Sequence, residues 1–248
     1  MTKLKKAEAK ALTLRTNWLD TARDKQLQPV IDHYIWLILA GRGWGKTRTG
    51  AQDIALYALR NPNSNCAVVA PTHGDLRRVC FGGPSGLLNV VPKECLLQST
   101  DQKGYSQSVK EMRLYNGSKI TGYAASEPER LRGPQFHRAW CDELGSWKNP
   151  EAWDQLLFGL RLGDKPQVII TTTPKPTDLI KELIVDKYTD EDIIELIADE
   201  KGDKIASQVR TMLPQLRHKL NPGTQVIDKT RTGSMKDPDI TGFVQETS

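Results

Sequence analysis

The apolar residues of this chain gather into short continuous runs, and several of the segments between these runs have helical spacing. Buried strands are predicted over residues 34–39, 66–70, 138–142 and 168–171. Helices are predicted over residues 49–60 and 150–162, and four apolar residues of the first can share one face: Ile54, Ala55, Ala58 and Leu59. Strands that alternate with helices indicate an α/β fold, in which helices flank a central, mostly parallel sheet and functional groups lie at the carboxyl ends of the strands.

Two segments depart from this alternation. Asn116-Gly117 separates residues 110–114 from residues 119–123, and this dipeptide between short strand-like runs predicts a β-hairpin. Residues 82–86 are rich in glycine and proline, which predicts a loop.

The last quarter of the chain has a different character. Residues 186–203 are strongly acidic, and from Asn221 onward Gly, Pro, Thr and Asp dominate. We therefore expect one domain over residues 1–185, with residues 1–30 as an N-terminal segment. Residues 186–248 are expected to form a linker or tail that is loosely ordered or docks on another surface.

The composition limits the size, location and cysteine chemistry of the protein but predicts no activity. With 248 residues the chain can form one large domain with a sizeable core. No apolar stretch approaches the ~20 residues of a membrane span, and the basic start lacks the apolar region of a secretory signal, so we expect a soluble intracellular protein without a membrane partner. The 4 cysteines form no Cys-x-x-Cys pair, which predicts buried free thiols. A net charge of +5 permits contact with a polyanion but is too mild to establish it.

Residues 40–47, Ala-Gly-Arg-Gly-Trp-Gly-Lys-Thr, lie between a predicted strand and a predicted helix, as a nucleotide-binding P-loop does. In such a loop backbone N–H groups and the helix N-terminus face the phosphates. Lys46 would contact the β- and γ-phosphates of ATP, and the Thr47 hydroxyl would bind Mg²⁺. Ala40 replaces the first glycine of the strict pattern, and a glycine-rich turn before a surface helix is the alternative. The expected nucleotide-binding residues of the loop are Gly41, Arg42, Gly43, Trp44, Gly45, Lys46 and Thr47.

Further candidate groups follow the later strands. Asp142-Glu143 offers one carboxylate for Mg²⁺ and a second to activate water, although Arg138 interrupts the apolar strand before the pair, which an ordinary polar strand end would also explain. The hydroxyls of Thr171, Thr172 and Thr173 close the next strand, where they either contact the γ-phosphate or the attacking water or simply end a strand.

Three arginines are candidates for stabilising the negative charge that develops on the phosphoryl oxygens during hydrolysis. Arg42 lies within the P-loop, whereas Arg130 and Arg132 lie in a turn-rich segment before the acidic strand. Surface salt bridges are the alternative explanation for these arginines.

Together these segments resemble the ATPase half of the large terminase subunits of tailed bacteriophages. The matching blocks, in order between residues 41 and 183, are Gly-Arg-Gly-Trp-Gly-Lys-Thr, Val-Val-Ala-Pro-Thr, Pro-Glu-Arg-Leu-Arg-Gly-Pro-Gln-Phe with Trp-Cys-Asp-Glu-Leu, and Thr-Thr-Thr-Pro-Lys-Pro. The resemblance implies an ASCE-type P-loop motor that hydrolyses ATP with Mg²⁺ and drives double-stranded DNA into a procapsid. It further implies a homo-oligomeric ring on the portal protein, a free monomer, the small terminase subunit as a partner, and the cytoplasm of the infected bacterium as the location.

The resemblance also implies roles for single residues. Lys46 and Thr47 match the Walker A pair, and Asp142 and Glu143 match the magnesium-binding and catalytic carboxylates of Walker B. Arg42 matches an arginine that acts in cis. The threonines Thr171, Thr172 and Thr173 match the coupling motif.

Two further residues are matched by their spacing. Arg132 resembles the arginine finger that such motors insert into a neighbouring subunit. Gln26 resembles the glutamine that reads adenine, and Gln28 is close enough in the sequence to be the alternative.

One departure from the family concerns the end of the chain. Full terminases continue into an RNase H-like nuclease, but only about 75 residues follow Thr173 here. Their acidic cluster resembles one side of a helix, so we expect no nuclease domain and no DNA cleavage. Two alternatives to a packaging motor stay open at this stage: a helicase-like ATPase stimulated by nucleic acid, and a truncated, non-catalytic scaffold that binds nucleotide.

Overall fold

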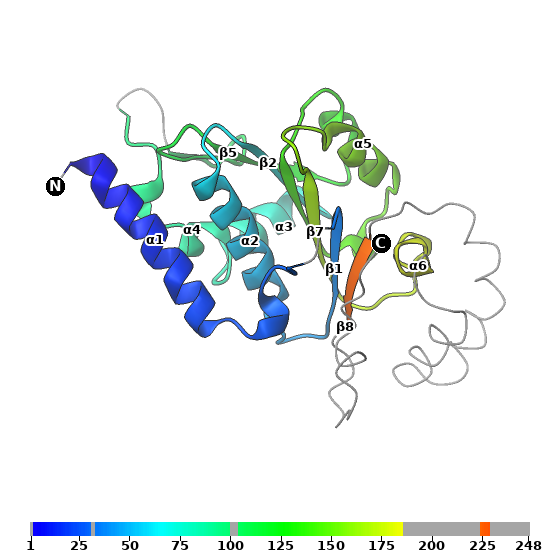
Figure 1. Cartoon of the computed structure of the whole chain (residues 1–248). Coiled ribbons are helices and arrows are strands. Elements are labelled where there is room, and N and C mark those ends of the chain that lie inside the picture. The colour runs from blue at the N-terminus through cyan, green and yellow to red at the C-terminus, as the bar shows by residue number, and fades with distance from the viewer. Residues whose placement is uncertain (1, 31–32, 100–103, 186–223, 229–248) are drawn as a thin grey trace.

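The computed structural model describes residues 2–30, 33–99, 104–185 and 224–228 of the chain. Its centre is an eight-stranded sheet in the order β3-β4-β5-β2-β6-β7-β1-β8 (Figure 1). The strands are β1 (Ile35–Leu39), β2 (Asn65–Ala70), β3 (Tyr105–Ser106), β4 (Glu111–Arg113), β5 (Lys119–Ala124), β6 (Arg138–Asp142), β7 (Gln167–Thr172) and β8 (Thr224–Asp228).

Six neighbouring strands, from β5 to β8 in the sheet order, run parallel, and only the β3-β4-β5 edge is antiparallel. The predicted hairpin around Asn116-Gly117 is confirmed as the β4-β5 pair. The register of β6 against β7 places Asp142 beside Thr171, and that of β1 against β7 places Leu39 beside Thr172. The carboxyl ends of the central strands therefore meet at one edge of the sheet, and the candidate residues follow them.

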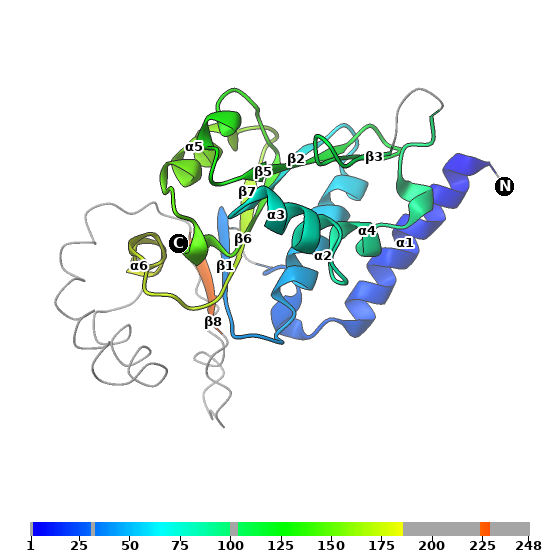
Figure 2. The same cartoon turned by 180° about the vertical axis from the view of Figure 1, so that it is seen from behind.

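Helices cover both faces of the sheet (Figures 1 and 2). The longer elements are α1 (Lys3–Thr21), α2 (Lys46–Arg60), α5 (Glu151–Gly159) and α6 (Asp178–Val185), and the shorter ones include α3 (His73–Asp75), a π-helical turn (Leu76–Phe81) and α4 (Leu87–Val90). Side chains alternate between the faces along each strand. In β1, Trp36 and Ile38 pack in the cluster that includes α2 and α4, whereas Leu37 and Leu39 pack in the cluster that includes α5 and α6.

The predicted α/β fold with a mostly parallel central sheet is thus confirmed, and no end of the four predicted central strands differs from the structure by more than one residue. The four apolar residues predicted to share one face of α2 are all buried. Helix α5 ends at Gly159, three residues before the predicted end, and Leu160 leaves helical geometry there. The basic N-terminal segment, for which the sequence pattern predicts no helix, forms α1 over residues 3–21 and packs Leu14 into the α2 side of the core.

The C-terminal segment contributes β8 to the sheet, parallel to β1. This strand lies beyond the domain boundary expected at residue 185. The acidic run at 186–203 and the rest of the predicted tail lie outside the described residues. The boundary itself stays a prediction.

All 4 cysteines are buried and none forms a disulfide, as expected. Within the ranges that the structure describes, none of the helices combines the length and the apolar composition that a membrane crossing requires.

Candidate functional site

The P-loop turns sharply between β1 and α2 because two of its glycines adopt left-handed backbone conformations. Gly43 has φ of 80° and Gly45 has φ of 92°, values that residues with a Cβ atom rarely adopt. Gly45 is the residue before the first turn of α2, so the free N–H groups of the helix face the loop. The loop therefore has the backbone geometry that the predicted anion cradle requires.

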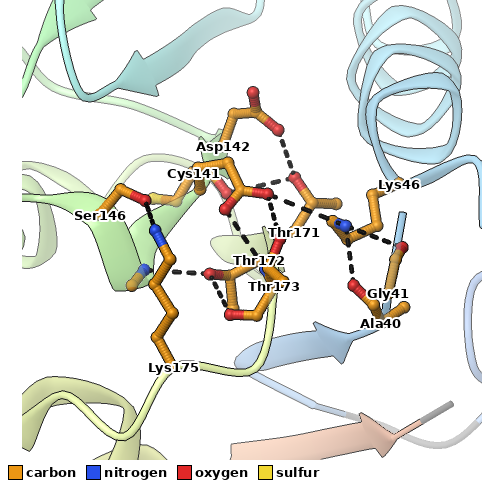
Figure 3. Close-up of polar contacts among 12 residues, drawn as sticks. Ala40, Gly41, Lys46, Cys141, Asp142, Ser146, Thr171, Thr172, Thr173 and Lys175 are labelled. Carbon is orange, nitrogen blue, oxygen red and sulfur yellow. Dashed lines mark hydrogen bonds and ion pairs between the residues drawn. The ribbon is translucent and has the colours of Figure 1, made fainter. Parts of the chain in front are cut away.

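Lys46 reaches back over this cradle (Figure 3). Its Nζ donates hydrogen bonds to the carbonyl oxygens of Ala40 at 2.7 Å and Gly41 at 3.1 Å, and it lies 3.8 Å from Oε1 of Glu143. Burial lowers the pKa of Lys46, and the nearby Glu143 carboxylate opposes this effect. The two candidate residues from the P-loop and from the end of β6 thus meet in space, although almost a hundred positions separate them in the sequence.

Asp142 is buried at the end of β6 and is held by neutral donors. The Thr171 hydroxyl donates to its Oδ1 at 2.9 Å, and the Cys80 thiol lies 3.6 Å from its Oδ2. Trp140 fixes the direction of this contact because its indole N–H donates to the Thr171 hydroxyl oxygen at 2.7 Å. Burial raises the pKa of Asp142 to about 6, and the Thr171 hydrogen bond only partly offsets this rise. A buried carboxylate of this kind favours a bound cation.

Glu143 occupies a strained position directly after the strand. Its φ of 48° is in the left-handed region, which is uncommon for a residue other than glycine and is found mainly where surrounding contacts impose it. The Thr173 hydroxyl donates to Oε1 at 2.8 Å, and the Thr173 backbone N–H donates to Oε2 at 3.3 Å. These bonds aim the carboxylate toward the P-loop.

The three threonines therefore lie around the acidic pair, and each hydroxyl has a protein partner. Thr171 contacts Asp142, Thr173 contacts Glu143, and Thr172 accepts a hydrogen bond from the Gly145 backbone N–H at 3.0 Å. Thr171 and Thr172 are fully buried, whereas Thr173 is half-buried. Thr171 and Thr173 thus hold the two carboxylates, and the expected contact of the three threonines with the nucleotide stays a prediction.

A cavity of about 370 Å³ opens beside these groups. The P-loop from Gly41 onward and the start of α2, including Thr47, form one wall, and Glu143 lines the cavity as well. The opposite wall comes from the segment after β2 and includes Arg78, Val79 and Ser85. The sequence pattern predicts only a loop over residues 82–86 and does not point to Arg78. The glycine-rich composition of the loop was the one signal that could have drawn attention to this wall.

The candidate arginines divide into two groups by position. Arg42 is exposed and lines the cavity together with the rest of the P-loop. Arg132 does not line it, and its guanidinium forms ion pairs with Glu129 at 3.0 Å and Glu151 at 2.8 Å. Arg130 likewise pairs with Glu127. Of the three candidate arginines, only Arg42 therefore lines the cavity within one chain.

Gln26 and Gln28 also lie in different surroundings. Gln26 is buried, and its Nε2 lies 3.2 Å from the Thr49 hydroxyl and 3.5 Å from the Trp44 carbonyl, directly behind the P-loop. Gln28 is exposed and bonds to Gln167 at 3.3 Å. Gln26 thus packs against the P-loop and Gln28 does not, and the adenine-reading role of either residue stays a prediction.

Arg138, which made the acidic strand look irregular, is a buried structural residue. Its Nε and Nη2 each lie 2.7 Å from a carboxylate oxygen of Asp53 on α2, and a third nitrogen contacts Gln167. The guanidinium also lies over the Tyr57 ring, 5.3 Å from its centroid. The charge at the start of β6 is therefore balanced inside the fold.

The oxygen donors at the other end of β6 suit magnesium. Mg²⁺ is usually held by one or two carboxylates or hydroxyls together with phosphate oxygens and water. Asp142 and Thr47 supply donors of this type. Among the residues that the structure describes, no group of three or more His, Cys, Asp or Glu residues is positioned to hold a metal ion alone.

Comparison with known proteins agrees with this geometry. The family model described as terminase large subunit, T4likevirus-type, N-terminal, matches residues 37–238. No curated protein sequence matches the chain. The large terminase ATPase domain of Thermus phage P74-26 superposes with a TM-score of 0.53 at 16% identity, over 68% of this chain and 71% of that one.

An arginine-to-alanine mutant of the same Thermus phage domain gives a TM-score of 0.52 at 15% identity, over 68% of this chain and 72% of that one. At such low identity the superpositions establish the fold, and the family match establishes the relationship. Because that match spans most of the sequence, this chain belongs to the family of N-terminal domains of terminase large subunits, the subunits that power the packaging of viral DNA.

Proposed function

We propose that this chain hydrolyses ATP in a Mg²⁺-dependent reaction and that this hydrolysis drives packaging of double-stranded DNA. The observation that carries the proposal is the meeting of Lys46 with the Asp142-Glu143 pair beside the P-loop cavity. Related support comes from the Thermus phage protein, whose domain is described as an ATPase domain.

Each polar group of the site has a defined task in this proposal. The P-loop N–H groups and Lys46 bind the phosphates. Thr47 and Asp142 would hold Mg²⁺, and the bound ion would neutralise negative charge on the phosphates. Glu143 accepts a proton from the attacking water, because the two bonds from Thr173 keep its carboxylate turned toward the cavity. Arg42 stabilises charge on the phosphoryl group from within the loop.

Arg132 completes the site of a neighbouring subunit. In a single chain its guanidinium is exposed and held by Glu129 and Glu151, away from the cavity. Such surface ion pairs stabilise the fold weakly, so a phosphate of a neighbour can replace them at small cost. We therefore propose a homo-oligomeric ring on the portal, with the small terminase subunit and DNA as further partners, acting in the cytoplasm of the infected bacterium.

Two rival functions, a helicase-like ATPase and a non-catalytic scaffold, are less favoured because the family match is to terminases. The first is tested by a strand-separation assay. The second is tested by hydrolysis in the presence of portal and DNA, where a scaffold would bind nucleotide without turnover.

The main test is the ATPase rate as a function of protein concentration. We expect the rate per subunit to rise as subunits associate, and Lys46→Ala to abolish hydrolysis at every concentration. Arg132→Ala is expected to lose only the increase that comes with association. Full activity of Lys46→Ala would refute the site, whereas full activity of assembled Arg132→Ala would refute only the contribution in trans.

A further inference from the structure

The segment after β2 forms a closely packed wall of the cavity, opposite the P-loop. A Cβ at Gly83 would lie 2.7 Å from the Val79 carbonyl oxygen, and one at Gly86 would lie 2.6 Å from the same atom, so both positions require glycine. This loop folds back on the π-helical turn, which itself contacts α2 and α4 (Figure 2). The wall therefore packs against α2, the helix that begins at Lys46 of the P-loop.

Arg78 is the charged residue of this wall. Gly74 makes room for it, because a Cβ at Gly74 would lie 2.9 Å from Nη2 of Arg78. The side chain is exposed and lines the cavity. In the part of the chain that the structure describes, no hydrogen bond or ion pair of Arg78 is found, in contrast to Arg130 and Arg132.

The charges that line the cavity favour a polyanion. Four cations, Arg42, Lys46, Arg48 and Arg78, face a single carboxylate, Glu143. Lys46 is already bonded to loop carbonyls, and the Arg48 guanidinium lies beside the Gln52 side-chain amide, whose oxygen accepts from it at 3.0 Å when the amide is turned over. Arg78 thus supplies positive charge from the wall of the cavity that lies opposite the P-loop.

The sheet order decides which end of a nucleotide Arg78 would meet. Strand β2 is the neighbour of β6 on the side away from β7 and β1, so the segment after β2 lies beyond Glu143 as seen from the P-loop strand. Because Glu143 lies where the attacked phosphate must be, this is the terminal-phosphate end of the cavity. We propose that Arg78 binds the terminal phosphate within the same subunit and makes the site prefer a nucleoside triphosphate over a diphosphate.

This inference rests on the proposed ATP site and is tested by equilibrium binding of ATPγS and ADP, each with Mg²⁺. Arg78→Ala is expected to weaken ATPγS binding by about 10- to 100-fold, the effect of losing a charge-assisted hydrogen bond, and to leave ADP binding nearly unchanged. Arg78→Lys keeps the charge and should recover part of the loss. Arg77→Ala is the matched control, because Arg77 is an exposed arginine of the same turn that does not line the cavity.

The outcomes separate this inference from the proposed function. Equal affinity of wild-type protein and Arg78→Ala for ATPγS would overturn the role of Arg78, while loss of binding in Lys46→Ala would still support the ATP site. An equal loss for ATPγS and ADP would also overturn it, because the contact would then not be with the terminal phosphate. Absence of nucleotide binding by wild-type protein would overturn both.

Discussion

The two ends of β6 carry buried charges of opposite sign, and only the charge at the start of the strand has a charged partner among the described residues. At the start, Arg138 is only 1% exposed, and its charge is balanced by two hydrogen bonds to Asp53. At the end, Asp142 is 4% exposed and is bonded by the neutral Thr171 and Cys80 side chains. No ion pair to Asp142 is found among the described residues.

The difference distinguishes Arg138, whose charge is balanced by a residue of the fold, from Asp142, whose charge we propose to be balanced by a bound ion. Burying a charge costs several kcal/mol unless a counter-charge or a metal compensates it. The Arg138-Asp53 pair supplies that compensation within the protein and connects β6 to α2. Asp142 is left without it at the strand end that faces the P-loop, which is where Mg²⁺ would supply the missing charge.

The largest expected effect is at the ligand-binding end. Glu143→Gln removes the proton acceptor but keeps the size of the side chain, and we expect ATP hydrolysis to fall by about 10²- to 10⁴-fold. Nucleotide binding should persist because the P-loop and Asp142 are unchanged. Single-turnover hydrolysis measured beside ATPγS binding separates the two effects, and a variant that hydrolyses ATP at the wild-type rate would remove Glu143 from the mechanism.

The architectural end should respond in stability instead. Arg138→Met leaves Asp53 buried without its counter-charge, and we expect the free energy of unfolding to fall by about 3–5 kcal/mol. Chemical denaturation measures this change. The double variant Arg138→Met with Asp53→Leu is the control and should lose less than the single variant, since neither charge remains. A double variant that is less stable than Arg138→Met would contradict the pairing.

The stability of the site end should depend on pH in a way that reveals the uncompensated charge. Burial raises the pKa of Asp142 from 3.8 to about 6, so above pH 6 its charged form opposes folding, and this opposition disappears as the pH falls toward 3.8. Without Mg²⁺, Asp142→Asn should therefore raise the free energy of unfolding at pH 8 by up to about 3 kcal/mol relative to its effect at pH 4. An effect of the same size at both pH values would mean that Asp142 is not an unbalanced charge.

A smaller effect should come from the residue that aims Glu143. Thr173→Val removes the hydroxyl that donates to Oε1, and loss of one such bond, about 0.5–1.5 kcal/mol, predicts a fall in hydrolysis of about 2- to 10-fold. Thr173→Ser keeps the hydroxyl and should remain near the wild-type rate. Steady-state rates of the two variants at equal ATP affinity test this point, and equal rates would show that the backbone N–H alone positions the carboxylate.

The sequence allowed the site to be predicted wherever a local pattern carries the chemistry. Apolar runs located the central strands, and the P-loop and the acidic pair follow two of them, so parallel topology brings Lys46 and Glu143 together. The same reasoning could not explain Arg138, because its partner Asp53 is 85 positions away on another element. A local pattern shows that a charge interrupts a strand but not that the fold neutralises it.

The parts that were missed have a similar cause. The short turns after β2 have no apolar periodicity, so only the folded chain brings Arg78 opposite the P-loop. Helix α1 has many exposed charged positions and a weak apolar stripe, and β8 is a short segment in a polar region that pairs with β1 from far along the chain. Each depends on contacts between distant segments rather than on local preference.

We infer that the end of β6 binds a cation together with nucleotide. The most direct measurement is the affinity for ATPγS with and without Mg²⁺, compared between wild-type protein and Asp142→Asn. We expect Mg²⁺ to tighten binding to wild-type protein by about tenfold, 1.4 kcal/mol, and to have much less effect on the variant. An equal response of both proteins to Mg²⁺ would contradict a role of Asp142 in the metal site, because the buried carboxylate would then have no part in holding the metal.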